Sequence, residues 1–165
     1  MSRAFVKEED QEEAPFIPPR AALPLGVTNY VTETGKQQLL DERKALEAEK
    51  AGLALEDEAE QRKALAVING KLQLLAERLG SAHVLSQPGS PDEVRFGAQV
   101  TLNVVGKNIK QQFRIVGVDE ADVNRQKIAF VSPIARAITG KRVGEVAQLR
   151  LGNEVRELEV LDIAY

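Results

Sequence analysis

Residues 65–79 read LAVINGKLQLLAERL, and five apolar side chains recur in this stretch at alternating steps of three and four residues. Such spacing lines one face of an α-helix and is typical of a coiled-coil seam. Further upstream, Leu39, Leu46 and Leu53 recur every seven residues. Two apolar seams in one short segment can bury each other when the chain turns back, so we predict an antiparallel coiled-coil hairpin over residues 31–86.

Acidic side chains gather where this hairpin has to turn, at residues 54–60. The leucine seam stops at Leu53 and resumes at Leu65, and between them lie four acids: Glu56, Asp57, Glu58 and Glu60. The helix macrodipole favours acids at a helix N-terminus, so one interpretation is that they cap the second helix. The other is that they project from the tip and hold a hard cation such as Mg²⁺ or orient a water molecule.

Basic residues on the first helix follow the same seven-residue repeat beside the seam: Lys36, Arg43 and Lys50. Long cationic side chains commonly cover a seam with their aliphatic stems and pair with glutamates. Contact of these three residues with an RNA backbone is the alternative.

Residues 1–30 have the composition of an extended tail, in which an acidic run precedes four prolines. Proline fixes φ and has no N–H to donate, so neither a helix nor a central strand is expected there. We predict a largely disordered leader. The alternative is that Phe5, Phe16 and Ile17 dock on the protein's own surface or on a partner.

Turn-forming residues at 87–92 mark a boundary before the C-terminal domain, residues 93–165. Pro133 and Gly140 frame a short helix between the third and fourth of five expected strands. We therefore predict an α+β protein, in which the helical hairpin is followed by a twisted antiparallel sheet packed on that helix. The expected strands are 99–105, 111–117, 127–131, 147–151 and 155–163.

Composition limits the classes of function. The 165 residues carry a net charge of −3, so binding to nucleic acid by clustered cations is not expected, and any such contact should be local. The chain has no cysteine and no apolar run near the roughly 20 residues that span a bilayer. We expect a cytoplasmic monomer with no membrane partner. His83 is the single histidine, so a Ser-His-Asp or Cys-His catalytic centre is not expected.

Four phrases in order carry a family resemblance: NYVT at 29–32, VRFGA at 94–98, VDEAD at 118–122 and SPIARAITGKRVGE at 132–145. Together they make residues 28–165 resemble the Gre family of bacterial transcription elongation factors. Members of that family have a coiled-coil arm and a C-terminal domain similar to the FK506-binding proteins. The resemblance implies that the C-terminal domain docks on the rim of the secondary channel of RNA polymerase and that the arm enters the channel.

The same resemblance implies roles for individual residues. Acids at the arm tip of the family help bind a second Mg²⁺ at the polymerase active site and stimulate cleavage of backtracked RNA at its 3′ end. Here the tip acids would be Asp57, Glu58, Glu56 and Glu60, and this chain would hold no metal or cofactor alone and have no catalytic residue of its own. The candidates for binding polymerase are Asp122, Ser132 and Pro133.

The tip departs from the family phrase GDxSENAEY, which matches best to LALEDEAEQ at 53–61. Ala54 stands where the first acid is expected, Asp57 where the second is, and the arm is shorter than the family's usual hairpin. The hypotheses are therefore a factor that stimulates cleavage and a channel-binding regulator that does not. Peptidyl-prolyl isomerase activity is a remote third, because such pockets are aromatic and this domain has few aromatic residues: Phe96, Phe113, Phe130 and Tyr165.

Overall fold

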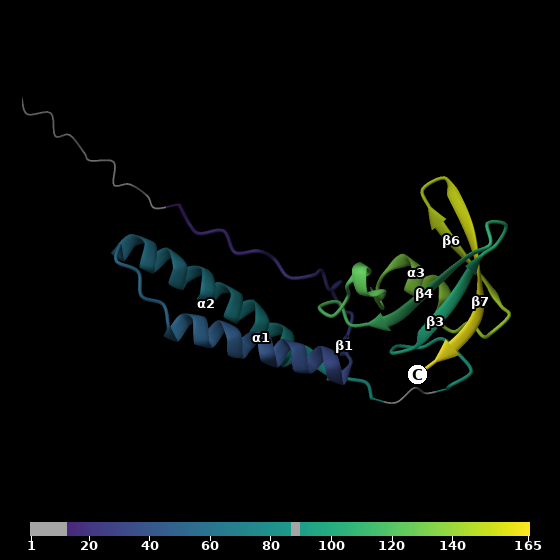
Figure 1. The fold of residues 1–165 in the computed structure, drawn as a ribbon, viewed down its shortest axis with the longest axis horizontal. Coiled ribbons are helices and arrows are strands. Elements are labelled where there is room, and N and C mark those ends of the chain that lie inside the picture. Colours follow the sequence, from purple (N-terminus) through teal and green to yellow (C-terminus); the bar gives the residue numbers. More distant parts are fainter. Residues whose placement is uncertain (1–12, 87–89) are drawn as a thin grey trace, which may run out of the picture.

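The computed structural model of the protein describes residues 13–86 and 90–165. A helical hairpin and a β-sheet domain lie end to end along the longest axis of the molecule (Figure 1). The predictions about Phe5, about the acids before residue 13 and about residues 87–89 of the boundary segment lie outside the described residues. No helix in the described part is long and apolar enough to cross a membrane.

The hairpin consists of α1 (Glu33–Ala51) and α2 (Glu58–Ser81), which pack side by side as the leucine repeats predict. Its core is formed by Leu39, Leu46 and Leu75, with Leu72 and Leu79 packed against them. Its 19 residues make α1 about 28 Å long at 1.5 Å per residue. The turn between the helices lies at the end of the hairpin that points away from the sheet domain (Figure 1).

Two short strands close the base of the hairpin, and neither was predicted. β1 (Asn29–Val31) leads into α1, β2 (Ala82–Val84) leaves α2, and the two pair in parallel. The buried Asn29 amide donates hydrogen bonds to the Arg78 carbonyl, at 3.1 Å, and to Ser81 Oγ, at 3.2 Å. These bonds connect the entry of the first helix to the exit of the second.

The C-terminal domain is a five-stranded sheet in the order β5-β4-β3-β7-β6. Its elements are β3 (Gln99–Val104), β4 (Ile109–Val116), the 3₁₀ turn η1 (Val123–Arg125), β5 (Lys127–Ala129), the helix α3 (Pro133–Ile138), β6 (Val146–Leu151) and β7 (Glu154–Ala164). The fold class is α+β, as predicted, but the sheet is mixed and not wholly antiparallel. β5 pairs in parallel with the last three residues of β4, because the chain runs back through residues 117–126 to the level of Arg114 before β5 begins.

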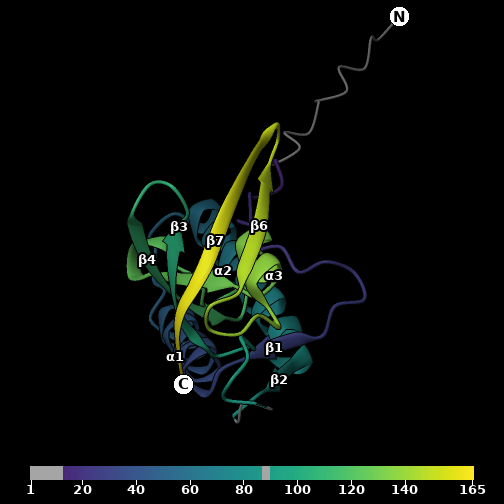
Figure 2. The same ribbon diagram turned by 90° about the vertical axis from the view of Figure 1, so that its right-hand side faces the viewer.

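The core of this domain lies between the sheet and α3, which packs beside β6 (Figure 2). On β3, Val100, Leu102 and Val104 are buried in alternation, as a strand with one face on a core requires. Ala135 and Ile138 of α3 are fully buried against the same core. Phe96, Phe113 and Phe130 are partly buried at its margin.

Residues 13–28 are extended, without helix or strand, and run along the hairpin toward the sheet domain (Figure 1). They contain no regular element, as their prolines predict. Part of this segment is docked on α2, so the alternative of docking on the protein's own surface holds for Ile17, whereas Phe16 is 79% exposed.

Candidate functional site

The first part of the candidate site is the hairpin tip, where Asp57 is the N-cap of α2. Its Oδ1 accepts hydrogen bonds from the backbone N–H of Ala59, at 2.8 Å, and of Glu60, at 3.4 Å. An aspartate at this position satisfies N–H groups that have no partner inside the helix. Asp57 therefore has the capping role that the first interpretation of the tip acids predicts.

The other three tip acids, Glu56, Glu58 and Glu60, have exposed side chains. Their oxygens are of the kind that Mg²⁺ prefers. In the part of the chain that the structure describes, no group of three or more histidine, aspartate or glutamate side chains is arranged to hold a metal ion. What the tip offers is a set of separate carboxylates around the start of α2.

The loop that carries these acids is held by Gln61, which the sequence interpretation missed. Its side-chain oxygen accepts a hydrogen bond from the N–H of Leu55, at 2.7 Å, and its amide nitrogen donates to the Leu53 carbonyl, at 3.1 Å. A glutamine one turn into a helix can reach back to the preceding loop, so its position four residues after Asp57 is the signal that could have pointed to it. Gln61 thus fixes the loop that precedes the acids.

The three basic candidates, Lys36, Arg43 and Lys50, are exposed along α1. Lys50 lies in the last turn of the helix, where a cation interacts favourably with the macrodipole. The structure spaces these side chains along α1, from Lys36 near its start to Lys50 in the last turn before the tip loop.

The second part of the candidate site is the turn before β5, which carries Asp122. Its side chain is 43% exposed, accepts a hydrogen bond from the N–H of Asn124 at 3.0 Å, and lies 3.6 Å from Arg125 Nε. Beside it, Val123 is 80% exposed. An exposed apolar side chain next to an accessible carboxylate suits a protein partner, and only the structure shows that Val123 faces solvent.

Ser132 and Pro133 lie at the other end of β5, where α3 begins. Ser132 Oγ accepts a hydrogen bond from the N–H of Ala135 at 3.3 Å, so Ser132 is the N-cap of this helix. Pro133 occupies the first turn, and its ring is exposed. The three-residue strand β5, about 10 Å long at 3.3 Å per residue, separates these two residues from Asp122.

Two further acids of the same turn, Asp119 and Glu120, face the hairpin. Glu120 is 8% exposed; its Oε2 accepts a hydrogen bond from Thr32 Oγ1 at 2.5 Å, and Lys127 Nζ lies 3.3 Å from its Oε1. A Cβ at Gly35 would lie 2.7 Å from Glu120 Oε2, so glycine in the first turn of α1 makes room for the carboxylate. This turn therefore joins the sheet domain to the start of the arm.

Two of the four aromatic residues that could line an isomerase pocket, Phe96 and Phe130, contact the arm. Tyr30 of β1 packs on Phe96 and on Phe130, with ring centroids 6.1 and 5.7 Å apart, and those two rings are 5.6 Å from each other. His83 packs edge-on against the same tyrosine at 5.8 Å. These rings join the arm base to the domain.

The two parts of the candidate site lie far apart. The tip acids are at the outer end of the hairpin, whereas Asp122, Ser132 and Pro133 belong to the sheet domain at its base (Figure 1). The arrangement therefore fits one surface for docking and a second, separate point of action.

Comparison with known proteins relates the sheet domain to a family of transcription elongation factors. Residues 88–165 match the family model described as "Transcription elongation factor, GreA/GreB, C-term". The chain is 41% identical over 100 residues to the transcription elongation factor GreA of Hyphomonas neptunium and 35% identical over 99 residues to that of Trichlorobacter lovleyi. Each match covers 59% of this chain and 63% of the relative, so it spans less than two thirds of the relatives' length.

Among solved structures, GreA factor homolog 1 of Thermus thermophilus is 22% identical, with a TM-score of 0.41 over 84% of this chain and 100% of that one. The similarity to GreA/GreB factors rests on the family model, which matches residues 88–165 and so includes the sheet domain, and on the sequence matches to the GreA proteins. Residues 88–165 thus resemble the C-terminal domain of the GreA/GreB transcription elongation factors.

Proposed function

We propose that this protein is an RNA polymerase-binding elongation factor that docks by its C-terminal domain and places its hairpin in the secondary channel. The observation that carries the proposal is the separation of a GreA/GreB-type domain from an acidic tip by a helix of 19 residues. In this position the tip would act on backtracked complexes, close to the 3′ end of the RNA. The factor would be an accessory to the active site of the polymerase and not an enzyme itself.

Docking would use the exposed surface around Asp122 and Val123 together with Pro133. This proposal is supported by the accessible carboxylate of Asp122 and by the 80% exposure of Val123. Charged groups at the rim of an interface mainly set the rate of association and its specificity. Apolar groups such as Val123 add buried area once the complex has formed.

If the tip stimulates cleavage, Glu56 and Glu58 are the carboxylates that would approach an Mg²⁺ of the polymerase. That ion, when bound, would polarise a phosphate oxygen or activate the attacking water. Because no three of the tip acids are grouped to hold a metal ion, this chain would supply only one or two ligands and the polymerase the rest.

A regulator that occupies the channel without stimulating cleavage is the second candidate. It is favoured by Asp57, whose carboxylate caps α2, and by Ala54, which has no carboxylate at the position of the family's first acid. Both features lower the number of acids available at the tip.

Stalled, backtracked complexes distinguish the two forms. Shortened RNA in the presence of the protein, lost in Glu56→Ala/Glu58→Ala but retained in Glu47→Ala, would establish cleavage through the tip. Glu47 is a matched control because it is an exposed acid on α1, away from the tip. Retained polymerase binding without shortened RNA would establish the second form, and absence of polymerase binding would refute both.

A further inference from the structure

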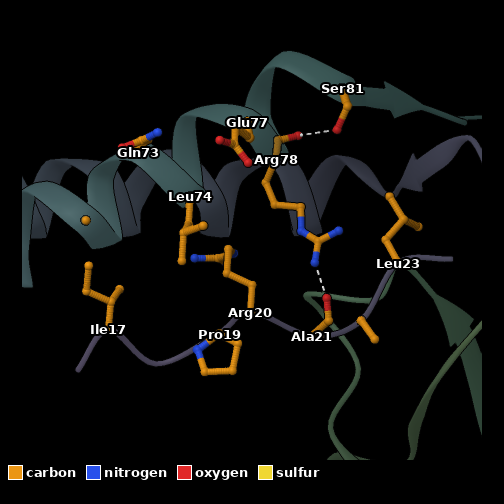
Figure 3. Close-up of a pocket in the computed structure, with 12 residues that line it drawn as sticks. Ile17, Pro19, Arg20, Ala21, Leu23, Gln73, Leu74, Glu77, Arg78 and Ser81 are labelled. Carbon is orange, nitrogen blue, oxygen red and sulfur yellow. Dashed lines mark hydrogen bonds between the residues drawn. The ribbon is translucent and has the colours of Figure 1, made fainter. Parts of the chain in front are cut away.

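The segment that docks on α2 has a regular inner face. Ile17, Arg20 and Leu23 are half-buried and recur every third residue, which is the period of a polyproline II helix. Pro18 and Pro19 lie between the first two of them and restrict the backbone to extended conformations. Figure 3 shows Ile17, Arg20 and Leu23 beside α2, near Leu74 and Arg78.

Ile17 occupies a site that exists because position 70 of α2 is glycine. A Cβ on Gly70 would overlap Ile17 Cδ1 and lie 2.8 Å from its Cγ1. Glycine is, apart from proline, the poorest residue for a helix interior, so a glycine here is unfavourable for the helix itself. Its presence is explained by the close approach of the extended segment.

Arg20 connects three parts of the molecule. Its Nη1 and Nη2 donate to the two carboxylate oxygens of Glu42 on α1, at 2.8 and 3.0 Å, while its Nε donates to Asp119 Oδ1 of the sheet domain, at 2.9 Å. The hydrogen bond with Glu42, together with the charge of Asp119, raises the pKa of Arg20 above its ordinary value, and burial opposes the rise. A planar guanidinium can make these contacts simultaneously, and a lysine cannot.

Arg78 of α2 completes the junction. Its Nε lies 3.2 Å from Asp119 Oδ2, and its Nη2 donates to the Ala21 carbonyl of the extended segment (Figure 3). The side chains of Arg20, Asp119 and Arg78 are 17%, 7% and 13% exposed, so solvent screens their interactions little. The carboxylate of Asp119 therefore lies between two arginines, one from the segment and one from the arm.

We propose that residues 15–23 form an intramolecular strap that sets the angle of the arm on the sheet domain, with Arg20 as its positioning residue. The start of α1 is already attached to the domain by the hydrogen bond between Thr32 and Glu120. Glu42 lies ten residues further along α1, about 15 Å from that point at 1.5 Å per residue. Tyr30 and Arg78 also contact the domain, but both lie at the base of the arm. The link from Arg20 to Glu42 adds an attachment about 15 Å further along α1, at about 1.5 Å per residue, and this attachment restrains rotation of the arm about its base.

The angle of the arm can be measured on the free protein. The chain has no cysteine, so spin labels at Glu49→Cys on α1 and Lys107→Cys between β3 and β4 are specific, and both positions are exposed. We expect a single narrow distribution of label-to-label distances in the otherwise unchanged chain. Arg20→Ala should lose that narrow peak, and Arg20→Lys should restore it only in part.

A second pair of variants separates loss of the strap from loss of folding. Gly70→Leu fills the site of Ile17 and improves the helix, so it should also lose the narrow peak. Gly80→Leu is the matched control, because a Cβ there meets no atom within 4 Å, and it should keep the peak. A narrow, unchanged peak in both Arg20→Ala and Gly70→Leu would overturn the proposal.

The consequence for transcription rests on the proposed function, whereas the distance measurement does not. If the factor docks only with its arm correctly oriented, and a released arm is so oriented about 10–30% of the time, the concentration for half-maximal effect on backtracked complexes should rise about three- to tenfold in Arg20→Ala. The maximal effect should be unchanged. An unchanged half-maximal concentration with a broadened distance distribution would show that the strap orients the arm in the free protein but does not affect binding to polymerase. Absence of any effect of the unaltered chain on polymerase would refute the proposed function alone.

Discussion

Two acids of one turn, Glu120 and Asp122, lie two positions apart but differ in burial and in the contacts that they make. Glu120 is buried against Thr32 and Lys127, whereas Asp122 is accessible and pairs with the exposed Arg125. Removing one member of a buried pair leaves the other uncompensated, whereas an exposed pair contributes little. The residue that holds the arm and the candidate for docking are thus separable by mutation.

We expect Glu120→Ala to lower the free energy of unfolding by about 2 kcal/mol, because it removes the partner of a half-buried Lys127 and of Thr32. Urea denaturation followed by circular dichroism measures the change. Asp122→Asn is the control and should stay within about 0.5 kcal/mol, since asparagine caps the following turn equally well. Equal losses in the two variants would contradict the assignment of Glu120 to the interior.

Glu93, at the start of the sheet domain, should titrate below the usual range of glutamate. Hydrogen bonds from Arg95, and then from Arg142, lower the pKa of its carboxyl group. Because the pKa is lower in the folded than in the unfolded state, this contribution to stability is present above the ordinary glutamate pKa and is lost as the pH falls through the folded value. NMR titration should show the pKa of Glu93 rising toward its ordinary value in Arg95→Ala and unchanged in Arg136→Ala.

At the level of elements, the hairpin depends on a few buried leucines. Leu75 is fully buried between α1 and α2, so Leu75→Ala should lower the free energy of unfolding by about 3 kcal/mol through lost burial and the cavity it leaves. Leu55→Ala in the tip loop should change it by less than about 0.5 kcal/mol, because that side chain is 44% exposed. Thermal unfolding checks both, and a similar loss in the two variants would mean that the helices do not pack through this seam.

The elements that could be predicted from sequence are those with a local signal. The seven-residue repeat of Leu39 and Leu46 requires a partner helix nearby, and Pro133 marks the start of α3. The parallel pairing of β5, and of β1 with β2, carries no such signal, because it depends on where the chain returns and not on which residues form the strand.

The residues of the candidate site likewise divide into those with a local sequence signal and those without one. Asp57 as a cap was one of two interpretations of the tip, because an acid before a helical run has a local meaning. Arg20 gave no signal, since its partners Glu42 and Asp119 are 22 and 99 residues away. Contacts at such separations become visible only in the folded structure.

At the level of the whole molecule, the proposed docking surface and the acidic tip lie at opposite ends of the hairpin (Figure 1). Sites that share no partners and lie more than about 10 Å apart contribute additively. The strap keeps the two ends in a fixed relation without connecting them energetically. In the proposed arrangement, the affinity of the factor for polymerase and its effect on the bound complex therefore depend on different residues.

We expect Asp122→Lys to raise the concentration of the factor needed for half of its maximal effect on backtracked complexes about tenfold, since it reverses a charge at the proposed interface. Glu56→Ala/Glu58→Ala should instead change the maximal effect and leave the half-maximal concentration alone, because the tip makes no contribution to docking in this model. In the combined variant the two changes should add in free energy to within about 0.5 kcal/mol. A dose–response series on one stalled complex measures all four proteins, and a tip variant that weakens binding as strongly as Asp122→Lys would show that the tip is itself part of the docking surface.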